Sequence, residues 1–240
     1  MQTDPQTEAP RARRPQEAID SHANLNEGPR DPLEQQLVSL ADGPEAQPEV
    51  RERLLAAALD CISGEGWGNL TIADIVRRAR VSKRTFYEHF STKDACLLAL
   101  FESAASELLL ELQAAQGEHS GQGTAGVAAG AMLYLARLKE RPRVVRTLLL
   151  EILSLGAEGL TARRRVMRSF ALFLQHAINE AGAGPPIGLD VATMIVGGIN
   201  EATLEALEED RLEQLTELVP AIVRLIDGVA QRQPARGESV

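Results

Sequence analysis

Aromatic side chains and cysteines are scarce in this chain. Only 3% of its 240 residues are aromatic, and Cys61 and Cys96 are its two cysteines. Strands favour aromatic and β-branched residues, whereas Ala and Leu, which are abundant among the 44% of apolar residues, lose little on entering a helix. Strand-like alternation of apolar and polar residues is also missing, so the expected fold class is all-α.

The sequence also lacks the patterns that catalysis, metal binding or membrane insertion would need. No Cys/His cluster has metal-ligand spacing, so we expect neither a metal nor another cofactor. No stretch approaches the roughly 18 uninterrupted apolar residues of a membrane span, and the apolar part of a secretion signal is missing. We therefore expect a cytoplasmic protein without a membrane partner. Because no Ser/His/Asp set or phosphate-binding glycine loop is present either, we expect that the protein is not an enzyme.

Negative charge prevails overall but not locally. The net charge is −9, with −6 in residues 1–50, +2 in residues 51–94 and −5 in residues 95–240. Residues 71–94 hold six bases against three acids. A basic face on an acidic body can bind phosphates while the remainder limits non-specific adhesion to nucleic acid.

Composition divides the chain into four parts. Residues 1–47 are rich in Pro, Gln, Glu and Asp, which predicts a mostly disordered extension. Helical periodicity predicts one domain over residues 48–108 and a second over residues 109–230, and residues 231–240 are expected to be a flexible tail.

Apolar spacing and capping residues place the expected helices. The first runs from Glu49 to Gly64, and Thr71 with Asp74 resembles a capping box that starts the second. Ser82 is expected to start a short third helix and Ser91 to cap a long fourth one. Further helices are expected at 124–140, 142–155, 159–182, 188–207 and 211–230, after a loop at 117–123, with breaks at Gly156 and Gly159 and a kink at Pro220.

Three short helices within about forty residues, with a short turn before the third, predict a helix-turn-helix at residues 71–90. In such a motif the N-terminal residues of the second helix face base edges, and flanking groups hold phosphates. The DNA-contacting candidates are Thr71, Arg80, Ser82, Lys83, Arg84, Thr85, Tyr87, His89 and Lys93. For each of these residues taken alone, an ordinary solvated helix face is the alternative. Phe86 and Phe90 are expected to point inward and lock the domain.

Residues 51–93 resemble, without gaps, the N-terminal domain of TetR-family transcriptional regulators. The matching pieces are Leu54-Leu55-x-Ala57-Ala58, Gly66-Trp67, Leu70-Thr71-Ile72-x-x-Ile75-Val76-x-x-Ala79-x-Val81-Ser82 and Thr85-Phe86-Tyr87-x-His89-Phe90-x-x-Lys93-Asp94. One position departs from the pattern, because Arg80 stands where the family commonly has glycine in the turn. If this position needs a positive φ, Arg80 is strained by about 1 kcal/mol. Either the turn is altered, or a phosphate contact by Arg80 offsets that strain.

The resemblance implies a homodimer on double-stranded DNA, with a small-molecule pocket in the C-terminal domain. Dimerisation would use the helices at about 188–207 and 211–230. Apolar candidates for that seam or the adjacent core are Leu189, Ile195, Ile199, Leu204, Leu215, Leu218, Ile222 and Ile226. Candidates for the effector pocket are Leu112, Met132, Met167, Phe170, Phe173, His176 and Met194, for which ordinary core packing or a surface position is the alternative.

These features together predict a sequence-specific DNA-binding regulator, acting as a repressor that a small-molecule effector releases from its operator. The alternative is a helical sensor or interaction module of the same fold that has lost DNA binding. Neither the effector nor the operator sequence follows from the residues, because apolar pocket walls resemble any helical core.

Overall fold

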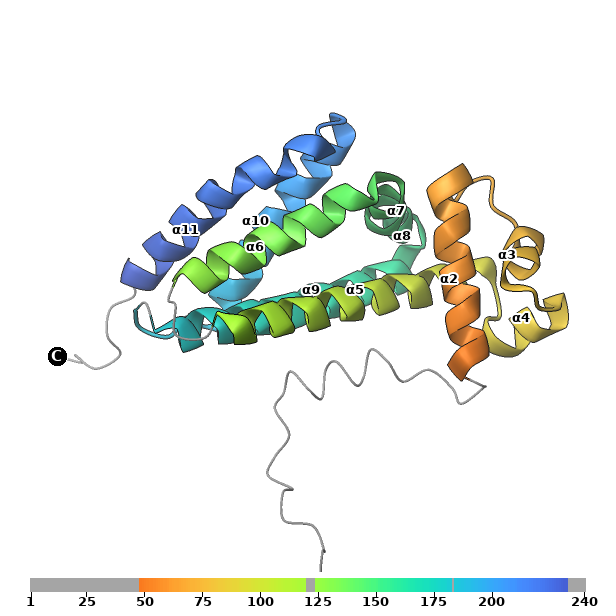
Figure 1. Ribbon diagram of the computed structural model, residues 1–240, viewed down its shortest axis with the longest axis horizontal. Coiled ribbons are helices and arrows are strands. Elements are labelled where there is room, and N and C mark those ends of the chain that lie inside the picture. Colours follow the sequence, from red (N-terminus) through yellow and green to blue (C-terminus); the bar gives the residue numbers. More distant parts are fainter. Residues whose placement is uncertain (1–47, 120–123, 183, 233–240) are drawn as a thin grey trace, which may run out of the picture. The chain divides into compact units, whose positions relative to one another are not determined.

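A computed structural model describes residues 48–119, 124–182 and 184–232 of the chain, and these residues form helices without strands (Figure 1). The all-α expectation is thereby confirmed. All of them fall within the larger of two units into which the chain divides, residues 32–240. Within these ranges no helix combines the length and apolarity needed to cross a membrane. The expectations for residues 1–47 and for most of the 231–240 tail lie outside the described residues.

Four helices follow the expected order in the N-terminal part. They are α2 (Pro48–Glu65), α3 (Ile72–Ala79), α4 (Lys83–His89) and α5 (Lys93–Glu118). The cap predicted at Ser91 is wrong: the Thr92 side chain accepts the hydrogen bond from the Ala95 N–H at 3.0 Å. An N-cap side chain reaches the N–H two or three residues ahead, and Thr92 has the extended backbone that this geometry needs. Helix α5 also continues to Glu118, into the stretch expected to be a loop.

The described C-terminal part contains eight further elements. They are α6 (Thr124–Glu140), α7 (Pro142–Arg146), the π-helical turn η1 (Thr147–Glu151), α8 (Ile152–Ser154), α9 (Gly156–Ala181), α10 (Leu189–Glu208), the 3₁₀ segment η2 (Leu212–Leu218) and, at the end, α11 (Val219–Arg232). The helix expected at 142–155 is therefore interrupted by η1. A π-helical turn widens the backbone ring, and such turns are frequent at functional sites.

The helix breaks predicted at Gly156 and Gly159 and the kink predicted at Pro220 have different outcomes in the structure. Gly156 has φ +64° at the start of α9, as expected for a break. The break predicted at Gly159 is wrong, because this residue lies inside α9, where a Cβ atom would approach the Ile152 carbonyl oxygen to 1.9 Å. Pro220 lies in the first turn of α11, a position that tolerates proline, and the expected kink is instead the change from 3₁₀ to α-helix at Val219.

Apolar side chains form a core that reaches from α2 to α11. One cluster joins α2–α5 to Val144, Leu148 and Ile152 of the segment α7–η1–α8. A second cluster lies among α6, α9, α10 and α11, and a third joins α5 to α9. Helices α5 and α9 lie side by side, and α2–α4 gather at one end of α5 (Figure 1). The domain boundary expected between residues 108 and 109 falls within α5, so the division into two domains stays a prediction.

Candidate nucleic-acid interface and internal cavity

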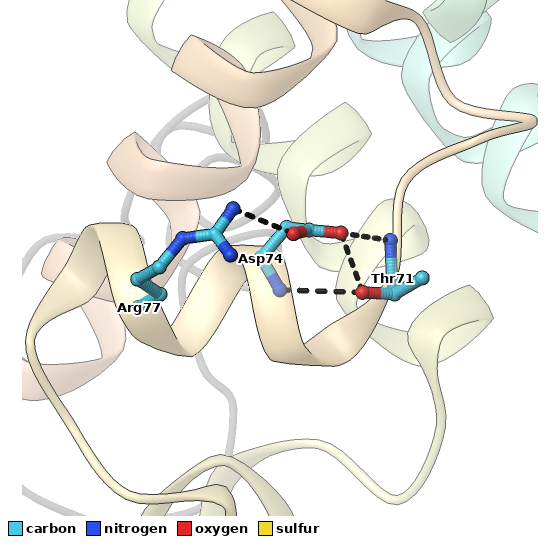
Figure 2. Close-up of polar contacts among 3 residues, drawn as sticks. All are labelled: Thr71, Asp74 and Arg77. Atoms are coloured by element: carbon cyan, nitrogen blue, oxygen red, sulfur yellow. Dashed lines mark hydrogen bonds and ion pairs between the residues drawn. The ribbon is translucent and has the colours of Figure 1, made fainter.

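The start of α3 is fixed by a reciprocal capping box (Figure 2). The Asp74 N–H donates to the Thr71 hydroxyl oxygen at 3.3 Å, and the Thr71 N–H donates to the Asp74 carboxylate at 3.1 Å. Arg77 donates to the other carboxylate oxygen at 2.7 Å. The hydrogen bond from the Thr71 hydroxyl, followed by that from its backbone N–H, holds the pKa of Asp74 below its ordinary value. The predicted capping box is confirmed, and it orients the N-terminus of α3.

The end of α3 is a Schellman motif with arginine in the glycine position. The Arg80 N–H donates to Arg77 O at 3.3 Å, and the Val81 N–H donates to Val76 O at 3.0 Å. Arg80 has φ +55° and ψ +46°, the left-handed conformation that glycine usually supplies. The turn is therefore unaltered, and the residue carries the strain itself.

Two arginine contacts between α2 and α3 hold α3 in place, and sequence reasoning missed both. Arg53 donates to the Ala79 carbonyl oxygen at 2.9 Å, which satisfies a carbonyl at the end of α3. Arg78 of α3 donates two hydrogen bonds, at 2.9 and 3.2 Å, to the Asp60 carboxylate of α2. A local sequence motif could not predict these two contacts, because the partners are separated by 26 and 18 residues.

Helix α4 begins at Ser82, as predicted. The Ser82 hydroxyl accepts the Thr85 N–H at 3.0 Å, and the two hydroxyl oxygens lie 2.9 Å apart. Phe86 and Phe90 are buried, with ring centroids 5.6 Å apart, and they turn the opposite side of α4 outward. The inward placement predicted for the two phenylalanines is confirmed.

The outward face of α4 carries Lys83, Arg84 and Tyr87. Arg84 is 89% exposed, and its only ion pair among the described residues is with Glu88 at 3.1 Å. A pair so exposed contributes little, so the guanidinium can leave it for a base edge. The side chains of Arg80 and Lys83, also exposed, make no ion pair or hydrogen bond within the part of the chain that the structure describes.

The side chains of Lys93, at the start of α5, and His89, at the end of α4, are less exposed than those of Lys83 and Arg84. The Lys93 ammonium donates to Leu70 O at 2.9 Å and to Trp67 O at 3.2 Å, and it lies 4.6 Å from the centroid of the Trp67 ring. An ammonium group has three donors, so one is left for a phosphate. The side chain of His89 is half-buried, and its Nδ1 is buried without a hydrogen-bond partner among the described residues.

Several of the predicted DNA-contacting residues thus lie exposed at helix ends or on α4. Thr71 and Ser82 are the exposed N-caps of α3 and α4, and Thr85, which is half-buried, contacts Ser82. Contact of any of these residues with DNA stays a prediction.

A second candidate site is a cavity of about 170 Å³ among α5, α6, the segment α7–η1–α8, α9, α10 and α11. One water molecule needs roughly 10–15 Å³ measured in this way, so the space suits an organic molecule. Of the pocket candidates, Leu112, Met167, Phe170 and Phe173 line the cavity. The other three do not: Met132, His176 and Met194 are exposed, because their positions on α6, α9 and α10 turn outward.

Polar groups are few in the cavity wall. Asn200 of α10 is 4% exposed, and its Nδ2 has no hydrogen-bond partner in the described part of the chain. Tyr134 of α6 packs edge-on against Phe170, and burial raises the pKa of its hydroxyl to about 12. Arg163 of α9 is half-buried. Sequence reasoning missed these residues, although Asn200 falls on the helical stripe that contains Val196 and Ile199.

The eight apolar residues predicted for the seam or the adjacent core lie in or against the core of this chain, and other apolar residues of α10 and α11 are exposed. Ile195, Leu215, Ile222 and Ile226 are buried in this chain's own core. Leu189, Ile199, Leu204 and Leu218 are half-buried and pack against the same cluster. The exposed large side chains are Met194, at 67%, and Leu225, and beside Met194 a Cβ added at Gly197 or Gly198 would meet open space.

Comparison with known proteins places the interface in a recognised domain. The family model described as bacterial regulatory proteins, tetR family, matches residues 54–100. The chain is 36% identical over 62 residues to an uncharacterised HTH-type transcriptional regulator, YvdT, of Bacillus subtilis. That match covers 26% of this chain, and the chain spans about a third (32%) of the length of this curated relative.

Solved structures share the fold over most of the chain. The fatty acid degradation regulator FadR of Bacillus halodurans has a TM-score of 0.64 at 18% identity, over 79% of this chain and 100% of that one. FadR of Bacillus subtilis, solved in complex with stearoyl-CoA, has a TM-score of 0.57 at 17% identity, over 73% of this chain and 96% of that one. At this level of identity the likeness concerns the fold alone.

Proposed function

Because residues 54–100 match the family model of bacterial regulatory proteins, tetR family, we propose that the chain is a sequence-specific DNA-binding transcriptional regulator of that family. The observation that carries the proposal is the outward face of α4. Lys83 and Arg84 stand exposed at the N-terminal end of a short helix that Phe86 anchors from behind. A helix presented in this way fits the major groove, where arginine or lysine can donate to guanine O6 and N7.

Phosphate contacts would set the register of α4 on the duplex. The N-terminus of α3 at Thr71 offers backbone N–H groups, and the exposed Arg80 and Tyr87 offer further donors. These contacts carry no sequence information, so base selection falls to Lys83, Arg84 and Thr85.

We further propose that two copies pair through α10 and α11. Support comes from the exposed Met194 and Leu225 and from the open space at Gly197 and Gly198, where a facing helix can approach closely. Pairing would place two α4 helices on successive turns of a pseudo-palindromic operator.

The effector proposed for this regulator binds in the cavity and releases the DNA. The segment α7–η1–α8 supports this link, because Leu148 and Ile152 line the cavity and also belong to the apolar cluster of α2–α5. A ligand that changes the packing of this segment can favour a conformation with a half-site spacing that no longer fits the operator. The neighbouring FadR structure with stearoyl-CoA agrees with a hydrophobic effector for this fold.

Selection of bound sequences from a random DNA pool tests the proposal. We expect enrichment of a two-fold symmetric site, with half-sites about 10 base pairs apart from centre to centre. Enrichment of no sequence at moderate salt would contradict it and would favour the alternative, a module of this fold without DNA binding.

Variants of α4 then assign the contacts. Arg84→Ala should weaken operator binding by about 1–3 kcal/mol and relax the preference at one base pair. Glu88→Ala removes the ion-pair partner of Arg84 from the same face and should leave that base preference intact. Equal base preferences in wild type and Arg84→Ala would remove the assignment.

The oligomeric state needs a separate measurement. Met194→Arg on α10 should shift the protein from dimer to monomer in sedimentation, since it buries a charge in the proposed interface. Leu110→Arg adds the same charge at an exposed apolar position of α5 and is the control. A dimer that persists in Met194→Arg would show that pairing uses another surface.

A further inference from the structure

The cavity wall holds a polar group that none of the described residues satisfies. Two other buried polar side chains have partners: the Ser169 and Thr203 hydroxyls donate to carbonyl oxygens of their own helices, at 3.2 and 2.9 Å. Asn200 is buried to a similar degree, but its Nδ2 donates to no atom of the described residues. A buried donor without an acceptor is destabilising and is rare in folded proteins, so its position in a cavity wall points to an acceptor on a ligand.

Two further polar groups of the wall, on Arg163 and Tyr134, can also donate to a ligand. The Arg163 side chain forms no ion pair or hydrogen bond within the described ranges, and the Tyr134 hydroxyl makes no hydrogen bond there either. The raised pKa of Tyr134 keeps this hydroxyl protonated, so it too can donate. None of the described residues that line the cavity is acidic. A wall with donors and one positive charge suits an anionic acceptor and disfavours a cation.

The cavity is also long. Its lining follows α5 from Phe101 to Gln116 and α9 from Arg163 to Ala177, which corresponds to about 21–22 Å along each axis. The two helices run in the same direction: Arg165 pairs with Glu102 near their starts, and Phe173 packs with Leu112 near their ends. Because the rest of the lining is almost entirely aliphatic or aromatic, the space suits one extended apolar chain rather than a compact polar molecule.

We propose that the cavity binds an elongated aliphatic carboxylate, with Arg163 and the Asn200 amide as its polar recognition groups. This inference rests on the proposed role of the cavity as an effector site and gives that effector a chemical class. The aliphatic chain lies along the apolar stripes of α5 and α9. Arg163 attracts the negative charge at one end of the α9 stripe, and the Asn200 amide donates to a ligand oxygen.

Calorimetric titration of the full chain, without DNA, compares three probes that share a twelve-carbon chain: dodecanoate, dodecan-1-ol and dodecyltrimethylammonium, each below its aggregation concentration. We expect dodecanoate to bind with one molecule per chain, the alcohol at least roughly tenfold more weakly, and the ammonium probe weakest of all. Ammonium binding as tight as that of dodecanoate would overturn the proposal.

A series of octanoate, dodecanoate and hexadecanoate tests the length of the site. Affinity should rise by about fourfold for each added CH₂ group until the apolar lining is filled. An affinity that is independent of chain length would contradict the extended binding mode.

Variants separate the two recognition groups from general packing. Arg163→Gln should abolish the preference for dodecanoate over dodecan-1-ol, whereas Arg164→Gln, at an exposed neighbouring position outside the cavity, should leave it intact. Asn200→Leu should weaken dodecanoate binding by roughly tenfold and raise the melting temperature of the unliganded protein, because it removes an unsatisfied buried amide. Unchanged dodecanoate binding in both Arg163→Gln and Asn200→Leu would overturn the assignment.

These titrations do not depend on DNA binding. If no carboxylate binds but the protein still selects an operator, the ligand class alone is wrong. If carboxylates bind but no DNA sequence is selected, the regulator proposal fails and the ligand class remains.

Discussion

The Arg143 guanidinium donates to the carbonyl oxygen of Gly64 at 2.5 Å and thereby ties the segment after α6 to the end of α2. A second hydrogen bond runs to Ser63 O at 3.3 Å. Helix α2 has no basic residue in its own last turn, so Arg143 supplies the positive charge that complements that helix end.

Arg143→Ala should therefore loosen the link between the cavity and α2. We expect the free energy of unfolding to fall by about 1 kcal/mol and operator affinity to become less sensitive to an effector. Fluorescence anisotropy of labelled operator, with and without ligand, measures that sensitivity. Arg141→Ala is the control, because Arg141 is exposed and its side chain makes no hydrogen bond or ion pair among the described residues. A full effector response in Arg143→Ala would contradict this link.

Arg80 offers a test in which stability and DNA binding change in opposite directions. Arg80→Gly should raise the free energy of unfolding by about 1 kcal/mol, because glycine adopts φ +55° without strain. Arg80→Ala keeps the strain and loses the same guanidinium. If Arg80 holds a phosphate, both variants should bind operator more weakly and with a shallower salt dependence. Equal stability of Arg80→Gly and Arg80→Ala would contradict the strain, and unchanged salt slopes would contradict the phosphate contact.

Lys93 is expected to contribute to stability as well as to phosphate binding. Lys93→Ala removes two hydrogen bonds and the contact with the ring of Trp67, so the free energy of unfolding should fall by roughly 1–3 kcal/mol. The emission of Trp67, the only tryptophan of the chain, should change as well. Lys83→Ala, on an exposed side chain without a partner in the described ranges, should leave both properties unaltered while it weakens DNA binding. A Lys93→Ala protein as stable as wild type would rule out this structural role.

Gly159 should tolerate no side chain. A Cβ at this position meets the Ile152 carbonyl oxygen, so Gly159→Ala must shift α8 or α9 and should destabilise the protein by about 1–3 kcal/mol. Gly117→Ala, near the end of α5 where a Cβ meets nothing within 4 Å, should instead stabilise it slightly. Thermal unfolding compares the two variants, and equal effects would refute the close approach.

Asp74 makes the stability of α3 dependent on pH. Because its pKa in the folded protein lies below the unfolded value of about 3.9, the carboxylate contributes stability above that value. The contribution is lost as the pH falls through the lower pKa of the folded state. The advantage of wild type over Asp74→Asn in melting temperature should therefore shrink below about pH 4. Glu52→Gln on α2, an exposed position without an ion pair among the described residues, controls for general acid effects. An advantage that is constant from pH 7 to pH 3 would contradict this assignment.

Local signals in the sequence predicted local structure well. Thr71 with Asp74, and Ser82 with Thr85, act within one helical turn, so residue type and spacing suffice to place the starts of α3 and α4. The cap of α5 was placed one residue early because Ser91 and Thr92 are both good caps, and the backbone conformation decides between them.

Packing between distant segments was not predictable in the same way. Met194 and Met167 are both methionines on helical stripes, yet Met194 faces outward and Met167 lines the cavity. Which stripe of a helix meets a neighbour depends on the whole arrangement of the bundle. For the same reason a glycine such as Gly159 indicates either a break or a close approach, and only the position of Ile152 distinguishes the two.

Helix α5 begins at Lys93, beside Trp67 and Leu70, and continues without interruption to Glu118, about 39 Å away. One end of this helix therefore packs against α2–α4, and its other half lines the cavity. A tilt of roughly 5° about one end displaces the other by about 3 Å, which is comparable with the rise of one base pair along a duplex. If α4 binds a DNA groove and the cavity an effector, as proposed, a small expansion of the cavity around Leu112 would be enough to shift α4 relative to the groove, even without a rotamer change in α4.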